Sequence, residues 1–198
     1  MDRKRDILQV KVTLTRVKPS VWRRIEVPAS YTFWELHVAI QDAMGWTDSH
    51  LHAFRVHDGH GQKVAIGIPD EDGFEGDEVY LPGWKQRVSD DLNVAGARAK
   101  YDYDFGDDWV HDVRVEAVEP RAKGVRYPRC TAGARRCPPE DCGGPQGYAE
   151  LLATIADPGH EEHESTLTWL GGSFDPSEFD PAAVQFDDPA ERWRIAFG

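Results

Sequence analysis

Three cysteines stand close together in the second half of the chain, in the pattern Cys130-x6-Cys137-x4-Cys142. Thiolates are zinc ligands, and a zinc ion can stabilise a Gly/Pro-rich loop that has little hydrophobic core of its own. The pattern lacks the paired Cys-x2-Cys spacing of zinc fingers and leaves the fourth ligand unknown, with Asp141, His111 or a histidine of the His50-x-His52 segment as candidates. The cluster is a candidate zinc site, and three ordinary free thiols around a turn are the alternative.

Three histidines form a second candidate site. His50 and His52 are two positions apart in an expected strand and so share a face, and His111 shares a face with Trp109 in a later hairpin. If these strands are neighbours, three imidazoles converge, which suits a metal ion or proton transfer; hydrogen-bonded core histidines are the alternative. The candidate ligand-binding or partner-binding residues are therefore His50, His52, Asp108, Trp109 and His111.

Basic residues gather near the tip of the first expected hairpin, at Arg16, Lys18, Arg23 and Arg24. They form a possible basic patch. The formal net charge of the whole chain is −12, however, and affinity for nucleic acid comes mostly from lysine and arginine, so a nucleic-acid partner is disfavoured. The sequence contains neither a phosphate-binding P-loop nor the motifs of serine hydrolases, zinc proteases or dinucleotide-binding enzymes.

The elements that position these residues begin with two strands, a helix and a third strand. Residues 7–14 and 21–28 alternate apolar and polar side chains, which predicts half-buried strands joined by a turn. Thr32 and Glu35 match a capping box, and Gly45 suits the end of the helix that follows. Residues 50–57 resume the strand pattern, so the chain starts β-β-α-β, with a β-grasp-like order.

Residues 100–118 predict an aromatic hairpin that turns at Gly106-Asp107-Asp108. The aromatic side chains are expected to face inward and the aspartates to face water. The expected inward set is Tyr101, Tyr103, Phe105 and Trp109, and the expected outward set is Asp102, Asp104 and Asp112. The spacing does not fit a calcium-binding EF-hand loop, because a glycine would stand in a ligand position. The acidic run in residues 70–78 is expected to be a solvated loop.

The last third of the chain predicts a Cys/Gly/Pro-rich connector and a group of short helices, several of them preceded by Asp-Pro, which caps and starts helices. The fold class is therefore α+β, with a mixed or antiparallel sheet. We expect a single domain over residues 1–198, in which 1–120 form the sheet and 121–198 form the connector and helical subdomain. No apolar stretch is long enough to span a membrane and the start has no signal-peptide pattern, so a cytoplasmic protein is expected.

Four segments, taken in order, carry a resemblance: HLHAF, YDYDFGDDWVHDV, CPPEDCGGPQGY and HEEHESTLTWLGGSFDPSEFD. Together they resemble the plasmid pRiA4b ORF-3-like family, whose members are also labelled TnpR-like passenger proteins of transposable elements. The resemblance implies an α+β fold without an established activity. A recombinase would need an activated nucleophile among arginines and a helix-turn-helix module, and the sequence has neither.

The function expected from the sequence is that of a non-catalytic accessory module linked to plasmids or mobile elements. It would bind a protein or a small ligand, with zinc as a possible stabilising cofactor at the cysteines. A metal-dependent enzyme with a His-lined site is the alternative, and a DNA-binding or recombination accessory protein is a third hypothesis.

Overall fold

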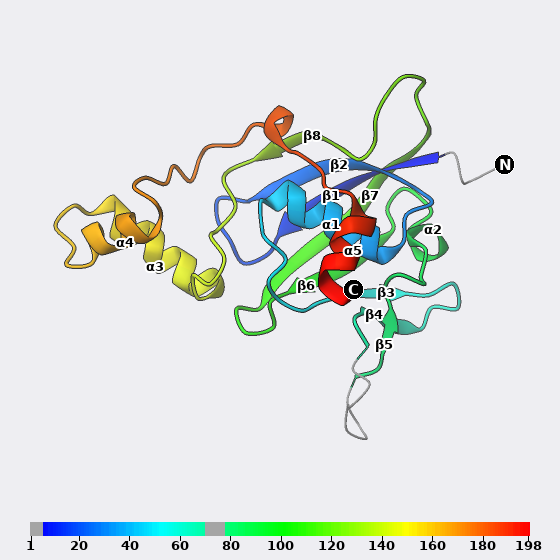
Figure 1. Ribbon diagram of the computed structural model, residues 1–198, viewed down its shortest axis with the longest axis horizontal. Coiled ribbons are helices and arrows are strands. Elements are labelled where there is room, and N and C mark those ends of the chain that lie inside the picture. Colours follow the sequence, from blue (N-terminus) through cyan, green and yellow to red (C-terminus); the bar gives the residue numbers. More distant parts are fainter. Residues whose placement is uncertain (1–5, 70–77) are drawn as a thin grey trace.

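The computed structural model describes residues 6–69 and 78–198, so most of the acidic run lies outside the described residues. Eight strands form one sheet in the order β5-β4-β3-β6-β7-β1-β2-β8 (Figure 1). The pairs are antiparallel except for β4 with β5, which is parallel. The strands are β1 Asp6–Leu14, β2 Trp22–Pro28, β3 His52–His57, β4 Lys63–Gly67, β5 Tyr80–Pro82, β6 Arg98–Tyr103, β7 Trp109–Pro120 and β8 Arg129–Ala134. The expected α+β class is confirmed.

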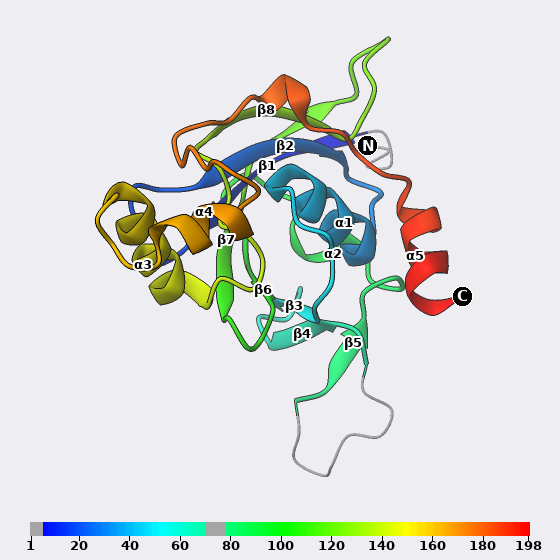
Figure 2. The same cartoon turned by 60° about the vertical axis from the view of Figure 1, so that its left-hand side comes forward.

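Within residues 6–69 and 78–198, five α-helices and one short 3-10 helix accompany the sheet. Helix α1 packs on one face of the sheet, α3 and α4 lie together at one end, and α5 lies beside α1 (Figures 1 and 2). The helices are α1 Phe33–Met44, α2 Val88–Asp91, α3 Gly144–Ala156, α4 His163–Trp169, η2 Pro181–Ala183 and α5 Pro189–Phe197. No helix in the described ranges is long and apolar enough to cross a membrane.

Helix α1 begins and ends where the sequence predicts. The Thr32 hydroxyl accepts from the amide of Glu35, the Glu35 carboxylate accepts from the amide of Thr32, and Gly45 ends the helix with a φ of 85°. These contacts satisfy backbone groups that a helix end leaves unpaired. The apolar stripe of Phe33, Leu36 and Ile40 is fully buried against the sheet, so α1 holds the centre of the core.

The aromatic hairpin also forms as expected, with β6 and β7 paired from Arg98–Arg114 to Tyr103–Trp109. Tyr101, Tyr103 and Trp109 are buried. Two expectations for this hairpin are wrong. Phe105 is 47% exposed, because it lies in the turn beyond the last paired residues. Asp104 is only 8% exposed, because its left-handed backbone (φ 54°) ends the strand alternation that would have pointed its side chain to solvent.

The segment after residue 120 is more closely integrated than a connector followed by helices. Strand β8 lies within it and pairs with β2, which extends the sheet by one edge strand. Helices η2 and α5 start as the Asp-Pro pattern predicts, since Asp180 and Asp188 accept from the amides of Ala182 and Ala190. The C-terminal third therefore contributes to both the sheet and its covering layer.

Candidate functional site

Three loops meet at one end of the central strands β3, β6 and β7, and they carry three of the four segments that bear the family resemblance. They are the segment before β3, the β6–β7 turn and the loop that leads into α3. The last two are in close contact: the amide of Gly143 donates to Oδ2 of Asp107 over 3.1 Å. A Cβ atom on Gly144 would lie 2.3 Å from the carbonyl oxygen of Asp107, and its φ is 68°. Only glycine allows this approach.

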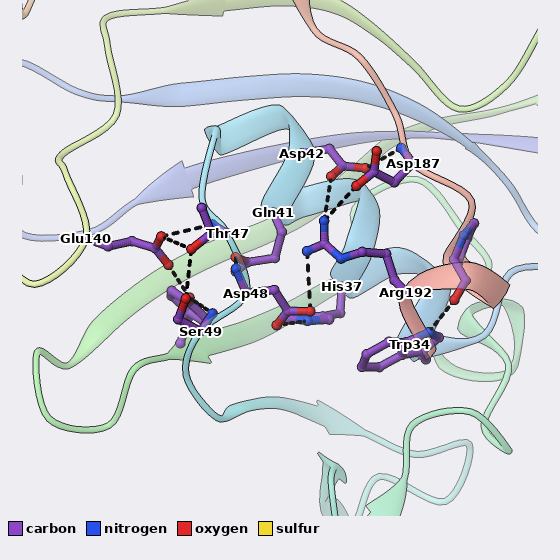
Figure 3. Close-up of polar contacts among 12 residues, drawn as sticks. Trp34, His37, Gln41, Asp42, Thr47, Asp48, Ser49, Glu140, Asp187 and Arg192 are labelled. Atoms are coloured by element: carbon purple, nitrogen blue, oxygen red, sulfur yellow. Dashed lines mark hydrogen bonds and ion pairs between the residues drawn. The ribbon is translucent and has the colours of Figure 1, made fainter. Parts of the chain in front are cut away.

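Glu140 fastens the loop before α3 to the rest of the junction. Its Oε2 accepts from the amide of Thr47 over 2.9 Å, and its Oε1 accepts from the Tyr103 hydroxyl. Nearby, Nε1 of Trp46 donates to the carbonyl of Pro138 over 2.9 Å. These bonds explain how a loop without regular structure keeps a defined position beside the hairpin (Figure 3).

His50, Asp104 and Asp141 converge at this junction. Nε2 of His50 lies 3.1 Å from Oδ1 of Asp141 and 3.6 Å from Oδ2 of Asp104, and potential ligand atoms of the three side chains all lie within 4.8 Å of one another. The second carboxylate oxygen of Asp104, Oδ1, accepts from the amides of Gly106 and Asp107 over 3.0 and 3.2 Å. These amides hold the carboxylate so that Oδ2 points at His50.

The spacing of these atoms suits a divalent metal ion. Ligand atoms bound at about 2.1 Å lie roughly 3.0 Å apart at right angles and roughly 3.4 Å apart in a tetrahedron. The observed 3.1 and 3.6 Å are close to those separations. One imidazole and two carboxylates are ligands that first-row transition ions accept. With three protein ligands, such an ion would keep positions open for water or another ligand.

A second group of possible ligands joins α1 to the segment before β3 and to β3, but it does not fit an ion. Its members are His37, Asp48 and His52. The rings of His37 and His52 are stacked 3.5 Å apart and inclined by only 8°. The nitrogen lone pairs of two parallel rings lie in two separate parallel planes, so they do not converge on one atom. Nε2 of His37 is also already bonded to Oδ1 of Asp48 over 2.7 Å (Figure 3).

This second group is part of a buried hydrogen-bond network. Nδ1 of His37 lies 2.8 Å from the Tyr101 hydroxyl, which also accepts from Nε2 of Gln41 over 2.8 Å. Oε1 of Gln41 accepts in turn from the amide of Asp48. Burial lowers the pKa of His37, although the bond to Asp48 acts in the opposite direction. The network ties α1 to β6 and to the loop that carries His50.

The three predicted histidines do not converge, which corrects the expectation for them. Strand β6 separates β3 from β7, so Tyr101 stands between His52 and His111, with ring centroids 6.1 and 5.2 Å from theirs. His50 precedes β3 instead of sharing its face with His52. His50 therefore joins the junction, whereas His52 and His111 belong to the core.

The other two candidate binding residues lie outside the His50 cluster. Trp109 is buried and packs against Trp46, with ring centroids 5.9 Å apart. Asp108 is exposed and forms an ion pair with Arg16 over 2.8 Å. Trp109 serves the core, and Asp108 links the hairpin turn to the β1–β2 turn.

The three cysteines are free thiols in the structure. The described residues contain two groups of three potential metal ligands within 4.8 Å, and neither includes a cysteine. Sγ of Cys130 bonds instead to the carbonyl of Ala132, and Cys137 is buried. Burial raises the pKa of the Cys142 thiol to about 12 and raises that of Cys137 as well. Zinc at these thiols stays a prediction.

The expected basic patch is largely neutralised or buried. Arg23 is 2% exposed, and its guanidinium donates to the carbonyls of Ala43 and Ala134 over 2.8 and 3.1 Å. Arg24 is paired with Glu116, and Lys18 is exposed. The inclusion of Arg23 in a surface patch was wrong, because this arginine faces the core.

Asp104 was not predicted as a site residue. His50 was predicted, and Asp141 was predicted as a candidate fourth ligand beside the cysteines. Strand alternation assigned Asp104 to the solvent face, although its position beside a Gly-Asp-Asp turn was a signal that the strand ends there. His37 and Gln41 were missed too, despite following Phe33 at intervals of four on the buried face of α1.

The comparisons with known proteins agree with this architecture. The family model for the plasmid pRiA4b ORF-3-like protein matches residues 6–183. An uncharacterized protein, y4hQ, from Sinorhizobium fredii (strain NBRC 101917 / NGR234) is 41% identical over 197 residues, with 94% of each chain covered. The crystal structure of a protein of unknown function, MM3350, from Methanosarcina mazei Go1 is 42% identical, with a TM-score of 0.83, and the match covers 91% of this chain and 98% of that one. The chain therefore belongs to the plasmid pRiA4b ORF-3-like protein family.

Proposed function

We propose that this protein is a metal-dependent binding module in which His50, Asp104 and Asp141 hold one divalent transition-metal ion. The observation that carries the proposal is their convergence: Nε2 of His50 faces two carboxylates at 3.1 and 3.6 Å. Each residue comes from a different loop, and the loops are fastened by Glu140 and by the close approach at Gly144. Such support for ligand positions is characteristic of metal sites.

The coordination positions of the ion that the protein leaves open would bind a small-molecule ligand. Asp141 also lines a cleft of about 380 Å³ beside α3 and α4. The polar lining of this cleft includes Glu150, Glu162, Ser165 and Thr166. Two carboxylates would repel an anion, whereas hydroxyl groups or an amine would find acceptors here. The favoured ligand is therefore a small neutral or cationic molecule whose oxygen or nitrogen atoms complete the coordination of the ion.

Titration of EDTA-stripped protein with Mn²⁺ and with Zn²⁺ in a calorimeter tests the proposal. We expect one equivalent to bind to the wild type, and the affinity to fall at least about tenfold in Asp104→Asn and in Asp141→Asn. Asparagine keeps the shape and tolerates the left-handed backbone of both positions. His50→Ala should lower the affinity as well. His57→Ala, which removes an exposed histidine, is its control and should bind as the wild type does.

Two further measurements identify the ligands of the ion. Water proton relaxation with Mn²⁺ should show exchangeable water on the bound ion, as expected if only three positions are taken by protein. Cys130→Ser should bind the metal as the wild type does. The proposal is wrong if the carboxylate variants bind as tightly as the wild type, or if Cys130→Ser alone abolishes binding.

A further inference from the structure

A single arginine of α5 fills a recess lined by carboxylates beside α1 (Figure 3). Nη1 of Arg192 lies 2.8 Å from Oδ2 of Asp187 and 3.5 Å from Oδ1 of Asp42, and Nη2 lies 3.4 Å from Oδ2 of Asp48. The side chains of Asp42 and Asp48 are only 6% and 13% exposed. Two largely desolvated carboxylates therefore face one cation that comes from a distant part of the sequence.

The recess is suited to a guanidinium group. Asp48 uses Oδ1 for His37 and has Oδ2 left for the arginine, so its orientation is fixed from the core side. Burial raises the pKa of Asp42 to about 6. A neighbouring cation compensates the cost of keeping such a carboxylate ionised. The planar guanidinium can contact several carboxylates at once, which an ammonium group does less well.

Aromatic side chains extend the recess into a groove. Trp34 and Trp84 line it, and Phe197 of α5 packs between them, with ring centroids 5.5 Å from each. A cleft of about 430 Å³ remains between these tryptophans and α5. We call the surface formed by Trp34, Asp42, Asp48 and Trp84 the α1 groove. It presents two acids and two large apolar faces to whatever lies on it.

Helix α5 itself has few of the features of a core helix. None of its residues is fully buried, and Ile195 is 78% exposed. A short helix is marginal in water without packing. Besides the Arg192 ion pairs and the aromatic contacts, α5 is held where the Pro189 carbonyl accepts from Nε1 of Trp34 over 2.9 Å. Helices attached in this way open locally at a lower free energy than the whole fold.

The groove and its occupant also differ in their relation to the family. All four residues of the α1 groove lie within residues 6–183, which the family model matches, whereas Arg192 and the rest of α5 lie beyond that match. The family model therefore includes the binding surface and ends before the helix that covers it.

We infer that the α1 groove is a binding site for an arginine-bearing amphipathic helix of a partner protein, and that α5 occupies it as an intramolecular competitor. The partner helix would place an arginine between Asp42 and Asp48 and an aromatic residue between Trp34 and Trp84, as α5 does with Arg192 and Phe197. This inference concerns a surface separate from the proposed metal ligands and does not depend on the metal.

A peptide of residues 184–198, labelled with fluorescein, is the probe, and its binding to the full-length chain is measured by fluorescence anisotropy. In the wild type, α5 competes at the high effective concentration of a tethered segment, so added peptide should bind weakly. In Arg192→Ala, the competitor is weakened while the groove is intact. We expect this variant to bind the peptide at least tenfold more tightly than the wild type.

Matched variants show whether the arginine is recognised. Arg194→Ala changes an exposed arginine of the same helix and should behave as the wild type. A peptide of residues 184–198 that carries Arg192→Ala should bind to the Arg192→Ala protein at least tenfold more weakly than the unaltered peptide does. Asp42→Asn, added to the Arg192→Ala protein, should weaken binding of the unaltered peptide by a similar factor. Circular dichroism confirms that each variant is folded.

Three results would overturn the inference. The first is the absence of saturable binding to folded Arg192→Ala protein, and the second is equal binding by Arg192→Ala and Arg194→Ala. The third is a dimer of the variant in light scattering, which would make a second copy of α5 the occupant. If Arg192→Ala does not fold, hydrogen exchange of the wild type decides: α5 amides should exchange at least a hundredfold faster than those in the middle of α1, and equal protection would refute the inference.

Discussion

The Nδ1 atom of His111 lies 3.2 Å from the carbonyl oxygen of Tyr101, and within the described part of the chain its Nε2 atom has no hydrogen-bond partner. The ring projects from β7, is fully buried, and lies against Trp46 and Tyr101, with centroids 5.3 and 5.2 Å away. Nδ1 therefore donates its proton to the carbonyl, and Nε2 is an unprotonated acceptor in an apolar environment. A second proton would place a charge in a ring that is removed from water, and this desolvation outweighs the favourable contributions of the Tyr101 and Trp109 backbone.

The first prediction concerns stability in acid. Burial lowers the pKa of His111 from 6.5 to about 4. As the pH falls below 6.5, His111 takes up a proton in the unfolded chain but not in the folded chain. This difference lowers the free energy of unfolding by roughly 2 kcal/mol at pH 5. The loss stops growing below pH 4, where His111 is protonated in both states. Urea unfolding of wild type and His111→Leu between pH 7 and pH 4.5 measures it: the variant should lose less stability. His57→Leu is the control and should follow the wild type; a parallel loss in both variants would show that His111 is not responsible.

The position of His111 also shows which features of the site could be predicted from the sequence. Alternation placed this residue on the Trp109 face of its hairpin, and that placement is right. Whether it meets His52 depends on the order of strands in the sheet, which local patterns do not contain. Strand β6 pairs with both β3 and β7. The elements follow from local chemistry, whereas their neighbours follow from the packing of the whole chain.

A second prediction concerns the buried Arg23. Its guanidinium bonds three backbone carbonyls and lies 3.6 Å from the centre of the Phe179 ring. Arg23→Ala leaves those carbonyls unpaired and removes this packing, so we expect a loss of about 3 kcal/mol or more in the free energy of unfolding. Arg24→Ala, which breaks a half-exposed ion pair on the other face of β2, should cost at most about 1 kcal/mol. Denaturant titration of both variants is the measurement, and similar losses would contradict this account.

The burial of Arg23 was readable in the sequence. In β2 it shares its face with Ile25 and Val27, both fully buried, whereas Trp22 and Arg24 share the opposite face. The prediction that both arginines belong to one surface patch disregards this alternation. The convergence of Asp104 and Asp141, in contrast, could not be predicted from strand alternation. Their 37 positions of separation are bridged by loops whose course depends on Glu140 and Gly144, and no periodic pattern describes such loops.

A third prediction isolates the contact between those loops. Gly144→Ala puts a methyl group against the Asp107 carbonyl and also strains a left-handed backbone, so it should cost about 3 kcal/mol or more. Gly124→Ala is the matched control. Its φ is 80°, but among the described residues no atom beyond its two chain neighbours lies within 4 Å of the added methyl, so only the backbone strain of about 1 kcal/mol applies. Thermal unfolding of both variants compares them. Equal losses would mean that the close approach contributes nothing.

The last prediction separates the positioning of Asp141 from the stability of the fold. Glu140 accepts from the Thr47 amide and from the Tyr103 hydroxyl, and Asp141 follows it directly in the chain. Glu140→Ala releases the loop while leaving all three proposed metal ligands in place, so the affinity for Mn²⁺ should fall by about tenfold or more. Glu140→Gln keeps one oxygen to accept a bond and should lose less. Glu119→Ala, which removes an exposed carboxylate from β7, lowers the net negative charge by the same amount and should leave the affinity within about twofold of the wild type. If Glu140→Ala and Glu119→Ala bind Mn²⁺ equally well, the hydrogen bonds of Glu140 are not needed to position Asp141.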